Sequence, residues 1–324
     1  MKNYSVRQYK SQDYEEWNAF IGKAKNATFL FHRNFIEYHQ ERFEDFSLLI
    51  FEEKKLVAAL PLNRVGNTVY SHQGLSYGGL IYNELMSQTA VLLVFKAVLV
   101  FLNKLDIQIV NMKMTPSIYH QKPADELLYV LFLVEAKLIR RDVLSVIDLT
   151  SAGIYSKIRK RGIKKAISKD LIIKEEDDFA SFWNAILIPN LKLRHNAIPV
   201  HSLEEISRLK QFFPSNIRQF NVYDAGEIVG GTTIFESEKV AHCQYISKFG
   251  IEETGSLDFL FDYLIRQEFA GKSFFDFGTS NIDDGKKLNQ GLTYWKESFG
   301  ASTSIQDFYE LETANYYKLD TVII

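Results

Sequence analysis

The chain has 324 residues, of which 46% are hydrophobic, 14% aromatic and 24% charged, a composition typical of a globular protein with a sizeable core. Its 38 basic and 40 acidic residues nearly cancel, so no overall positive field indicates nucleic acid and any anion-binding surface must be local. Cys243 is the single cysteine, which excludes an intrachain disulfide and a cysteine-rich metal site.

The first half of the chain predicts a hairpin, a strand, a helix and a strand, in that order. Residues 49–62 (LIFEEKKLVAALPL) have the pattern of two strands joined by a short polar turn, and residues 67–73 predict a third strand. The apolar run 90–103 predicts a buried helix, because it is too short to span a bilayer and carries Lys96 near its middle. Residues 107–114 predict the next strand.

The same order of elements recurs in the second half. Residues 221–234 (NVYDAGEIVGGTTI) predict a second hairpin, and residues 238–244 predict the strand that follows it. Apolar residues at helical spacing predict a helix over 256–269, and a strand is expected over 272–280. Agreement in order and spacing indicates a duplication.

The duplication predicts the α/β (α+β) class and two similar domains, 1–150 and 151–324. The boundary is expected where a strand-like segment ends and a strongly basic helix begins. A further helix is expected over 202–213, with Ser202 and Glu205 as a capping box.

The basic helix has seven cations between residues 157 and 169 and no acid among them. They are Lys157, Arg159, Lys160, Arg161, Lys164, Lys165 and Lys169. Such a cluster can hold a diphosphate, whether of a lipid carrier, a nucleotide sugar, CoA or tRNA, and Arg159 and Arg161 are the expected contacts. The alternative is a solvated helix face with the apolar residues turned inward.

A duplicated unit of this kind resembles the Fem-type aminoacyltransferases, in which the acyltransferase fold of the GNAT superfamily occurs twice. The basic helix at 158–171 resembles the helix that opens their second domain, and FFDFGTSN at 274–281 with LNQGLTYWKESFGA at 288–301 resembles their closing segment. The resemblance implies tandem GNAT-like domains with mixed central sheets and flanking helices, the second domain holding the active site.

One feature of the Fem enzymes is missing from the sequence. Those that use charged tRNA often carry a helical-hairpin insertion in the second domain, and no uninterrupted pair of charged helices is evident in this chain. The sequence is therefore closer to related GNAT-like proteins of cell-envelope and polysaccharide synthesis. Fold alone does not define the reaction, so each site residue needs its own argument.

Lys296 lies in the closing segment beside Trp295 and Phe299. Acyl transfer to an amine needs a positive group where negative charge develops, and an ammonium in partly apolar surroundings attracts an anion more strongly than in water. In the Fem enzymes the lysine of the matching motif is linked to substrate phosphate or to the transferred acyl group. The resemblance thus implies a catalytic Lys296 and a substrate-binding Trp295. The alternative is a lysine whose stem covers Trp295.

Three polar residues lie at or just past the end of the strand predicted at 238–244. His242 and Gln244 point the same way if the strand is regular, and Tyr245 follows them. Because a histidine titrates near neutral pH, His242 is a candidate relay for the proton of the attacking amine, with Gln244 and Tyr245 as binding residues. The alternative is a structural histidine.

The loop before the second-half helix is compared with the GNAT phosphate loop, which holds the CoA pyrophosphate on backbone N–H groups. FGIEETGSLDFL keeps Gly255 and a helix start near Ser256, but it lacks the basic residue and the second glycine, and Glu252 and Glu253 would repel phosphate. The loop LIYNELMSQTA of the first half has no glycine at all. The first domain is therefore expected to supply acceptor contacts or scaffold.

Arg194 and His195, near Pro199, are candidates for contacting the acceptor; the alternative is a loop held by local hydrogen bonds. The seven histidines have no metal-binding spacing, so no metal is expected. Hydrolase, kinase and dehydrogenase motifs are also missing from the sequence.

The expected function is an acyltransferase that forms an amide on an amino group of a cell-envelope or polysaccharide precursor. The alternatives are a CoA-dependent N-acetyltransferase of a small amine or amino sugar, and a non-catalytic module that binds such precursors. No tightly bound cofactor is expected; the acyl donor is either an acyl-CoA or an aminoacyl-tRNA. The acceptor is expected to be small or lipid-linked, with no role for DNA. The expected location is the cytoplasm, with peripheral association at the inner membrane face as an alternative.

Overall fold

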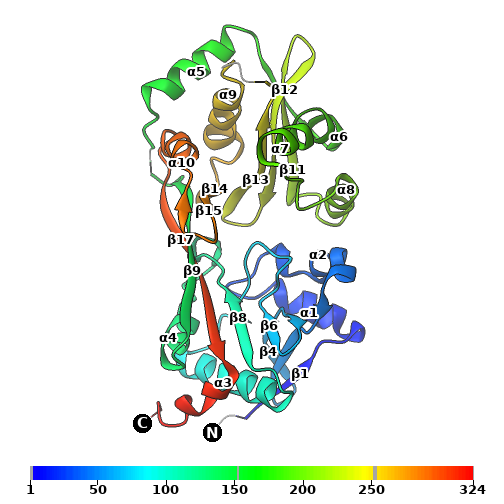
Figure 1. The fold of residues 1–324 in the computed structure, drawn as a ribbon, viewed down its shortest axis with the longest axis vertical. Coiled ribbons are helices and arrows are strands. Elements are labelled where there is room, and N and C mark those ends of the chain that lie inside the picture. The colour runs from blue at the N-terminus through cyan, green and yellow to red at the C-terminus, as the bar shows by residue number, and fades with distance from the viewer. Residues whose placement is uncertain (1–2, 152, 251–253, 324) are drawn as a thin grey trace. The chain divides into compact units, whose positions relative to one another are not determined.

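The computed structural model describes residues 3–151, 153–250 and 254–323, apart from the side chains of Arg194 and His195. No helix in these ranges combines the length and the hydropathy needed to cross a membrane. The described residues form two compact units, each built from strands and helices (Figure 1).

Unit 1 comprises Met1–Asp142 and Ile305–Ile324, and unit 2 comprises Val143–Ser304. This division differs from the expected domains 1–150 and 151–324. The last residues belong to unit 1 because strand β17 pairs there, antiparallel, with β8. Strands β9 and β17 each contribute residues to both units, which a sequence repeat cannot reveal because it carries no information on long-range pairing.

Unit 1 has two sheets. One has the order β1–β3–β4–β7, and the other continues from β17 in the order β8–β6–β5–β2, with β6 and β8 parallel. The strands are β1 Tyr4–Gln8, β2 Glu44–Asp45, β3 Leu48–Glu52, β4 Lys55–Leu60, β5 Asn63–Val65, β6 Thr68–Tyr70, β7 Ile81–Tyr82, β8 Ile109–Lys113 and β17 Ser302–Glu312. The α-helices are α1 Tyr14–Ile21, α2 Arg33–Ile36, α3 Gln88–Lys104 and α4 Glu126–Leu133.

Unit 2 has a mixed sheet in the order β10–β11–β12–β13–β14–β9, in which only β13 and β14 are parallel. Its strands are β9 Lys137–Asp148, β10 Ile172–Glu176, β11 Ile217–Asp224, β12 Glu227–Glu236, β13 Val240–Lys248 and β14 Phe274–Thr279, and the short pair β15 Asn281–Ile282 and β16 Lys287–Leu288 lies apart. The α-helices are α5 Lys157–Ile167, α6 Ala180–Phe182, α7 Ile188–His195, α8 Leu203–Phe212, α9 Ser256–Tyr263 and α10 Gln290–Glu297.

Helices cover both faces of the unit 2 sheet. Figure 1 shows α5 and α9 on one face and α6, α7 and α8 on the other. The core beneath α5 and α9 contains Ala166 of α5, Phe261 of α9, Phe275 and Phe277 of β14, and Phe299, which follows α10. Two segments of π-helix, Trp183–Leu187 and Leu264–Glu268, extend α6 and α9.

The predicted order of elements is found in both units, although hairpin β3–β4 lies in a separate sheet from β6 and β8 whereas β11–β12 pairs with β13 in one sheet. Hairpin β3–β4 corresponds to β11–β12, strand β6 to β13, helix α3 to α9 and strand β8 to β14. The helix expected over 202–213 is α8, and its capping box between Ser202 and Glu205 is present. The basic segment forms α5, which begins at its N-cap Ser156.

Strand β13 contains a bulge. Thr233 on β12 lies opposite Tyr245, but its neighbour Ile234 lies opposite Cys243, which leaves Gln244 as the extra residue. The bulge shifts the alternation of side chains, so that Ile246 packs with Cys243 against the core beneath α9 while Tyr245 packs on the Trp183 ring. The regular strand expected through residue 244 is thus interrupted at its end.

Beyond this point β13 continues without its parallel neighbour. Its pairing with β14 ends at His242 opposite Asp276, although β13 extends to Lys248. Two parallel strands that separate leave backbone groups of both without strand partners and make room for another molecule between them.

Candidate functional site

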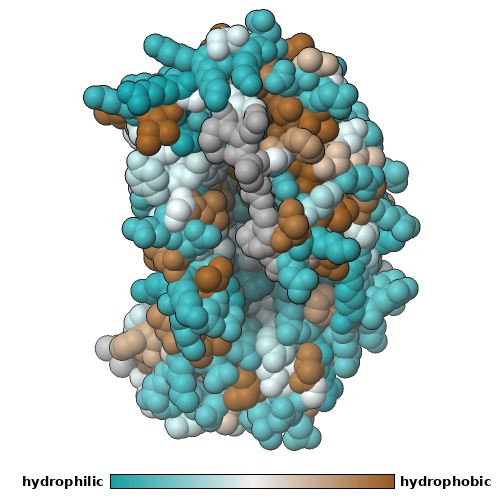
Figure 2. Space-filling view, turned by 45° about the horizontal axis from the view of Figure 1, so that its top comes forward, coloured by the Kyte–Doolittle hydropathy of each residue, from teal (hydrophilic) through white to brown (hydrophobic). Residues whose placement is uncertain are grey.

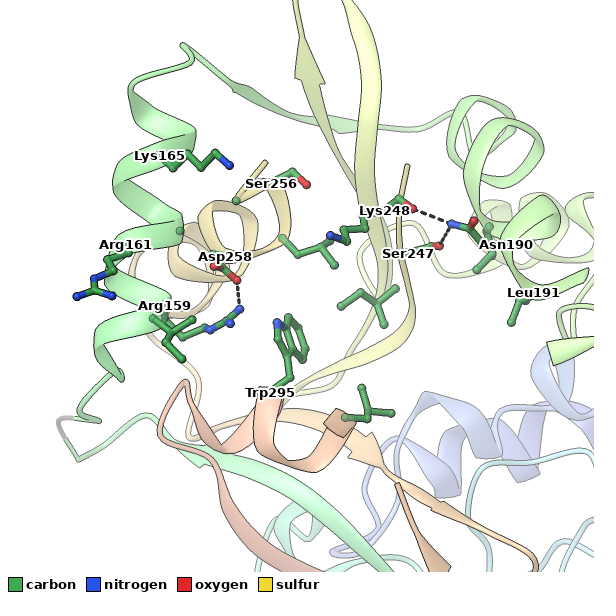
Figure 3. A pocket seen from close by; sticks show the side chains of 17 residues that line it. Arg159, Arg161, Lys165, Asn190, Leu191, Ser247, Lys248, Ser256, Asp258 and Trp295 are labelled. Atoms are coloured by element: carbon green, nitrogen blue, oxygen red, sulfur yellow. Dashed lines mark hydrogen bonds and ion pairs between the residues drawn. The ribbon is translucent and has the colours of Figure 1, made fainter. Parts of the chain in front are cut away.

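A cavity of about 750 Å³ lies in unit 2 beside the start of α9. Helix α5, the first turn of α9, the end of β13, helix α7 and helix α10 contribute to its wall (Figure 3). On β13 the lining residues are Ile246, Ser247 and Lys248, which all follow the last pairing with β14. The cavity is therefore a consequence of the separation of the two parallel strands.

Two glycines bring α5 and α9 together at the edge of this cavity. Gly255 is the N-cap of α9, and its φ of 81° lies in the left-handed region that favours glycine. A Cβ on Gly255 would lie 2.1 Å from the Gly162 carbonyl oxygen, and a Cβ on Gly162 would lie 1.8 Å from an Asp258 carboxylate oxygen. Neither position accepts a larger residue without a shift of backbone or of a buried acid.

The first turn of α9 offers hydrogen-bond donors to an anion. Ser256 is 1% exposed, and its Oγ and the Nε of Arg159 are buried without a hydrogen-bond partner among the described residues. Both residues line the cavity, at the N-terminal end of α9, where the helix dipole favours negative charge. A phosphate or carboxylate oxygen would satisfy these donors.

Charges around the cavity are mainly positive. Arg159 is paired with Asp258, while Arg161, Lys165 and Lys248 also line the wall. Figure 3 shows Arg159 and Lys165 extending from α5 toward α9, whereas the Arg161 side chain points away from it. Arg159 and Lys165 are thus better placed than Arg161 to meet a ligand.

The opposite wall is mostly apolar. Leu191 of α7 and Trp295 of α10 line it, and Asn190 fixes the end of β13 through hydrogen bonds from its Nδ2 to the Ser247 Oγ and the Lys248 carbonyl, both 2.7 Å long. An apolar wall with a few fixed polar groups is typical of small-molecule and cofactor sites.

His242 forms a dyad with Asp276 at the point where β13 and β14 separate. The His242 Nδ1 lies 3.0 Å from the Asp276 Oδ2, and the other carboxylate oxygen accepts a 2.7 Å hydrogen bond from the Gly278 N–H. Asp276 is buried whereas His242 keeps part of its ring exposed. A carboxylate that holds one ring nitrogen fixes the orientation of the imidazole and leaves the other nitrogen to exchange a proton.

Lys296 is buried rather than open to the cavity. It is 3% exposed, and its ammonium donates to the carbonyls of Gly278 and Thr279, at 2.9 and 2.8 Å. Burial lowers the pKa of Lys296 to about 8, an effect that the nearby Cys243 and Asp276 oppose. The ammonium therefore holds the last two residues of β14, which follow Asp276 of the His242–Asp276 dyad.

Tyr245 is also occupied by protein contacts. Its hydroxyl lies 2.6 Å from the His201 Nδ1 and accepts a 3.2 Å hydrogen bond from the His201 N–H. Burial raises the pKa of Tyr245 to about 12. Arg194 and His195 end helix α7, but their side chains are outside the described part of the chain. Residues Glu252 and Glu253 lie wholly outside it.

The cavity brings together about half of the expected site residues. Those that line it are Arg159, Arg161, Gly255, Ser256 and Trp295; those described elsewhere are His242, Gln244, Tyr245 and Lys296. The sequence interpretation missed Lys248, Asn190 and Leu191. Lys248 follows the predicted strand and Asn190 follows a proline, and neither position has a pattern that indicates a ligand site. The pairing of Asp258 with Arg159 was also missed.

Sequence comparison identifies no relative: no protein-family model and no curated protein matches the chain. Solved structures do resemble it. The crystal structure of FemX matches with a TM-score of 0.69 at 9% identity, over 97% of this chain and 99% of FemX.

Two further structures match most of the chain. L-PGS from Bacillus licheniformis has a TM-score of 0.56 at 11% identity, over 89% of this chain and 94% of its own. A tandem GNAT protein from the clavulanic acid biosynthesis pathway has a TM-score of 0.50 at 12% identity, over 96% and 99%. At such low identities the likeness concerns the fold, which is the tandem GNAT fold seen in FemX, as the repeat and the closing segment predicted.

Proposed function

We propose that the protein is an acyltransferase that binds a phosphate-bearing acyl or aminoacyl donor in the cavity of unit 2 and transfers the acyl group to an amine. The observation that carries the proposal is the cavity itself, which lies between the N-terminus of α9 and the part of β13 that has left its parallel partner. It offers buried donors for a phosphate at one end and an apolar wall for a flexible arm.

The donor's phosphate is assigned to the first turn of α9. The unpartnered Ser256 Oγ and Arg159 Nε would donate to it, and Lys165 and Lys248 add positive charge to the same wall. Asp258 keeps Arg159 in place through their ion pair. Acyl-CoA carries its acyl group at the end of a long arm that starts from a diphosphate, and aminoacyl-tRNA carries it on a ribose next to a phosphate. Both donors therefore offer a phosphate, and the phosphate-binding residues alone do not select between them.

The His242–Asp276 dyad is assigned to the proton of the attacking amine. As the amine nitrogen bonds to the acyl carbon and the donor's leaving atom departs, the amine must lose a proton, and a histidine held by a carboxylate is suited to take it. Trp295, which lines the cavity, is in edge contact with the Phe277 ring, one residue from Asp276. Asp276 leaves the opposite face of β14 from Phe277, and neither His242 nor Asp276 is among the residues that line the cavity, so the assignment rests on the chemistry of the dyad and on its place where β13 and β14 separate.

Lys296 is assigned a positioning role. Its ammonium holds the carbonyls of Gly278 and Thr279, while the Gly278 N–H donates to Asp276. The lysine thereby fixes the end of β14, whose Gly278 N–H orients the Asp276 carboxylate.

The similar structures support this class of reaction by the names they carry. The C-terminal domain of a putative lysylphosphatidylglycerol synthetase from Agrobacterium fabrum matches with a TM-score of 0.55 at 11% identity, over 80% of this chain and 82% of its own, and its name joins an amino acid to a lipid. The structure of the clavulanic acid pathway protein is described as being without AcCoA. The acceptor that we propose is an amine of a cell-envelope or polysaccharide precursor.

A transfer assay tests the proposal. The protein is incubated with acetyl-CoA or with an aminoacylated RNA, together with amino sugars and envelope precursors that carry a free amine, and products are followed by mass. A mass gain on the acceptor that is lost in His242→Ala supports the acyltransferase. Binding of a precursor without a mass gain from either donor would instead favour the non-catalytic binding module.

A further inference from the structure

We propose that helix α5 docks unit 2 on an anionic lipid bilayer. The net charge of the chain is close to zero, so the cations of α5 are a local feature rather than part of a general positive field. Five cations on α5 or just after it, defined here as the α5 cations, are exposed and have no ion pair within the described chain. They are Lys157, Lys160, Arg161, Lys164 and Lys169.

The inward face of α5 packs against the rest of unit 2. Ala166 is buried in the core, Gly162 touches α9, and Arg159 is paired with Asp258. At 3.6 residues per turn, Lys157, Lys160, Arg161 and Lys164 share the opposite face of the helix. The cations therefore look outward, and a group of four to eight lysines and arginines beside an amphipathic helix is typical of binding to anionic lipid headgroups.

Exposed isoleucines accompany these cations. Ile154 just before α5 is 84% exposed, Ile158 is 49% exposed and Ile167 is 57% exposed. Single exposed apolar residues are ordinary, but Ile158 and Ile167 flank the cationic face of α5 on its two sides, Ile154 precedes the helix, and together they provide apolar area that a bilayer interface buries. A nucleic acid would engage the cations through its phosphates and leave the isoleucines in water. The combination favours lipid over RNA.

The cavity rim has the same mixed character. Ile158 lines the cavity on α5, and Leu193 and Phe249, which are 84% and 64% exposed, follow the cavity residues Leu191 and Lys248 by one or two positions. Figure 2, which turns the α5 end of unit 2 toward the viewer, shows hydrophobic groups beside the hydrophilic ones there. Docking through α5 would bring the cavity next to the headgroups, whether or not the proposed reaction takes place there.

The test is co-sedimentation of the full chain with vesicles of phosphatidylcholine alone and of phosphatidylcholine mixed with an equal part of phosphatidylglycerol. We expect binding only to the mixed vesicles and weaker binding at high salt. The double variant Lys160→Gln/Lys164→Gln, which leaves the cavity wall intact, should weaken binding roughly 25-fold, since each lysine near an anionic surface contributes about fivefold. The variant Ile154→Ser/Ile167→Ser should weaken it by about tenfold.

The matched control is Lys54→Gln/Lys55→Gln, which removes two exposed lysines from the β3–β4 turn of unit 1 and should bind like the wild type. Unchanged thermal unfolding verifies that each variant is folded. Failure to sediment with the mixed vesicles, or binding that the α5 lysine variant does not alter, would overturn the proposal. So would loss of binding to a homopolymeric RNA in the lysine variant combined with wild-type vesicle binding in the isoleucine variant, because that pattern identifies a nucleic-acid site.

Discussion

The two units share one order of elements but differ in what lies beside the parallel strand pair. In unit 2, β13 runs on past β14 and the cavity there measures about 750 Å³. In unit 1, a space of about 80 Å³ lies beside the corresponding pair β6–β8, and residues of β8, β9 and β17 line it rather than the start of α3, the counterpart of α9. The large cavity at the helix start thus belongs to unit 2, whereas the space beside β6–β8 is small and lies against other strands.

Side chains of unit 1 occupy the corresponding place. After β6 the chain turns through His72, whose φ of 64° is unusual for a residue with a side chain, and the His39 and His72 rings stack 5.3 Å apart. His39 packs so closely on Gly74 that a Cβ there would lie 1.8 Å from the ring. Lys113 donates a 2.6 Å hydrogen bond to the Leu75 carbonyl across the same region.

The helices that follow differ as well. Helix α3 is a long buried helix capped by Ser87, whereas α9 is shorter and begins at Gly255 against α5. The comparison indicates that the fold alone does not create the site. The site is created by strand β13, which continues past the end of its pairing with β14, and by the glycine at the start of α9. We therefore assign the chemistry to unit 2 and a scaffold role to unit 1.

The largest expected effect is on turnover in unit 2. His242→Ala should lower the transfer rate by roughly 10²–10⁴-fold because the amine loses its proton acceptor. The aligned position in unit 1 is Ser71, and Ser71→Ala should leave the rate per folded molecule unchanged. Steady-state kinetics on both variants checks this. If the transfer rate fell equally in His242→Ala and Ser71→Ala, the proposed role of the dyad in unit 2 would be contradicted.

The packing of His39 in unit 1 should be sensitive to truncation of its side chain. His39 is buried, so His39→Ala removes a packed ring and should lower the free energy of unfolding by about 2–4 kcal/mol. Denaturant unfolding measures the loss, and transfer by the folded fraction should be preserved. A variant that keeps its stability but loses activity would place unit 1 in the reaction.

Gly255 is expected to be intolerant of any side chain. Gly255→Ala places a Cβ 2.1 Å from the Gly162 carbonyl at a φ of 81°, which should cost about 1–3 kcal/mol and move α5 away from the start of α9. Donor affinity should fall together with stability. Ser87→Ala, at the start of α3, should cost about 1 kcal/mol through the lost cap and leave donor affinity unchanged.

A further expected effect is on the pH dependence of stability. Burial lowers the pKa of Lys296 to about 8, so the folded protein binds fewer protons than the unfolded chain between that value and the ordinary 10.5. The cost of the buried charge is fully present below pH 8, and stability should rise with pH through this window by about 1 kcal/mol per pH unit for each lysine of this kind. In Lys296→Met the rise should be smaller, because Lys113 of unit 1, whose pKa burial also lowers to about 8, retains its part. Unfolding curves at several pH values for both proteins test this, and equal slopes would contradict it.

Much of the fold could be predicted because its signals are local. The helix over 256–269 follows from apolar spacing, and the start of α8 follows from Ser202 and Glu205. The exchange of β17 into unit 1 could not be predicted, since its pairing with β8 joins distant parts of the chain.

The site was predicted less well for the same reason. The bulge at Gln244 and the end of pairing at His242 depend on neighbouring strands, and they decide which side chains meet the cavity. The charge of Lys296 was noticed in the sequence, but its partners are two backbone carbonyls, which no residue pattern encodes. The partner of Asp276 is His242 on the neighbouring strand, a pairing that depends on the register of β13 and β14.

The most direct measurement of the central claim is thermal unfolding with donor on the wild type and on Leu191→Trp, which places an indole into the unit 2 cavity. At about 100 times its dissociation constant, a donor that binds the folded protein should stabilise the wild type by roughly 2.7 kcal/mol. The same donor should leave Leu191→Trp unshifted. Equal stabilisation of both proteins would show that the donor binds elsewhere and would contradict the account.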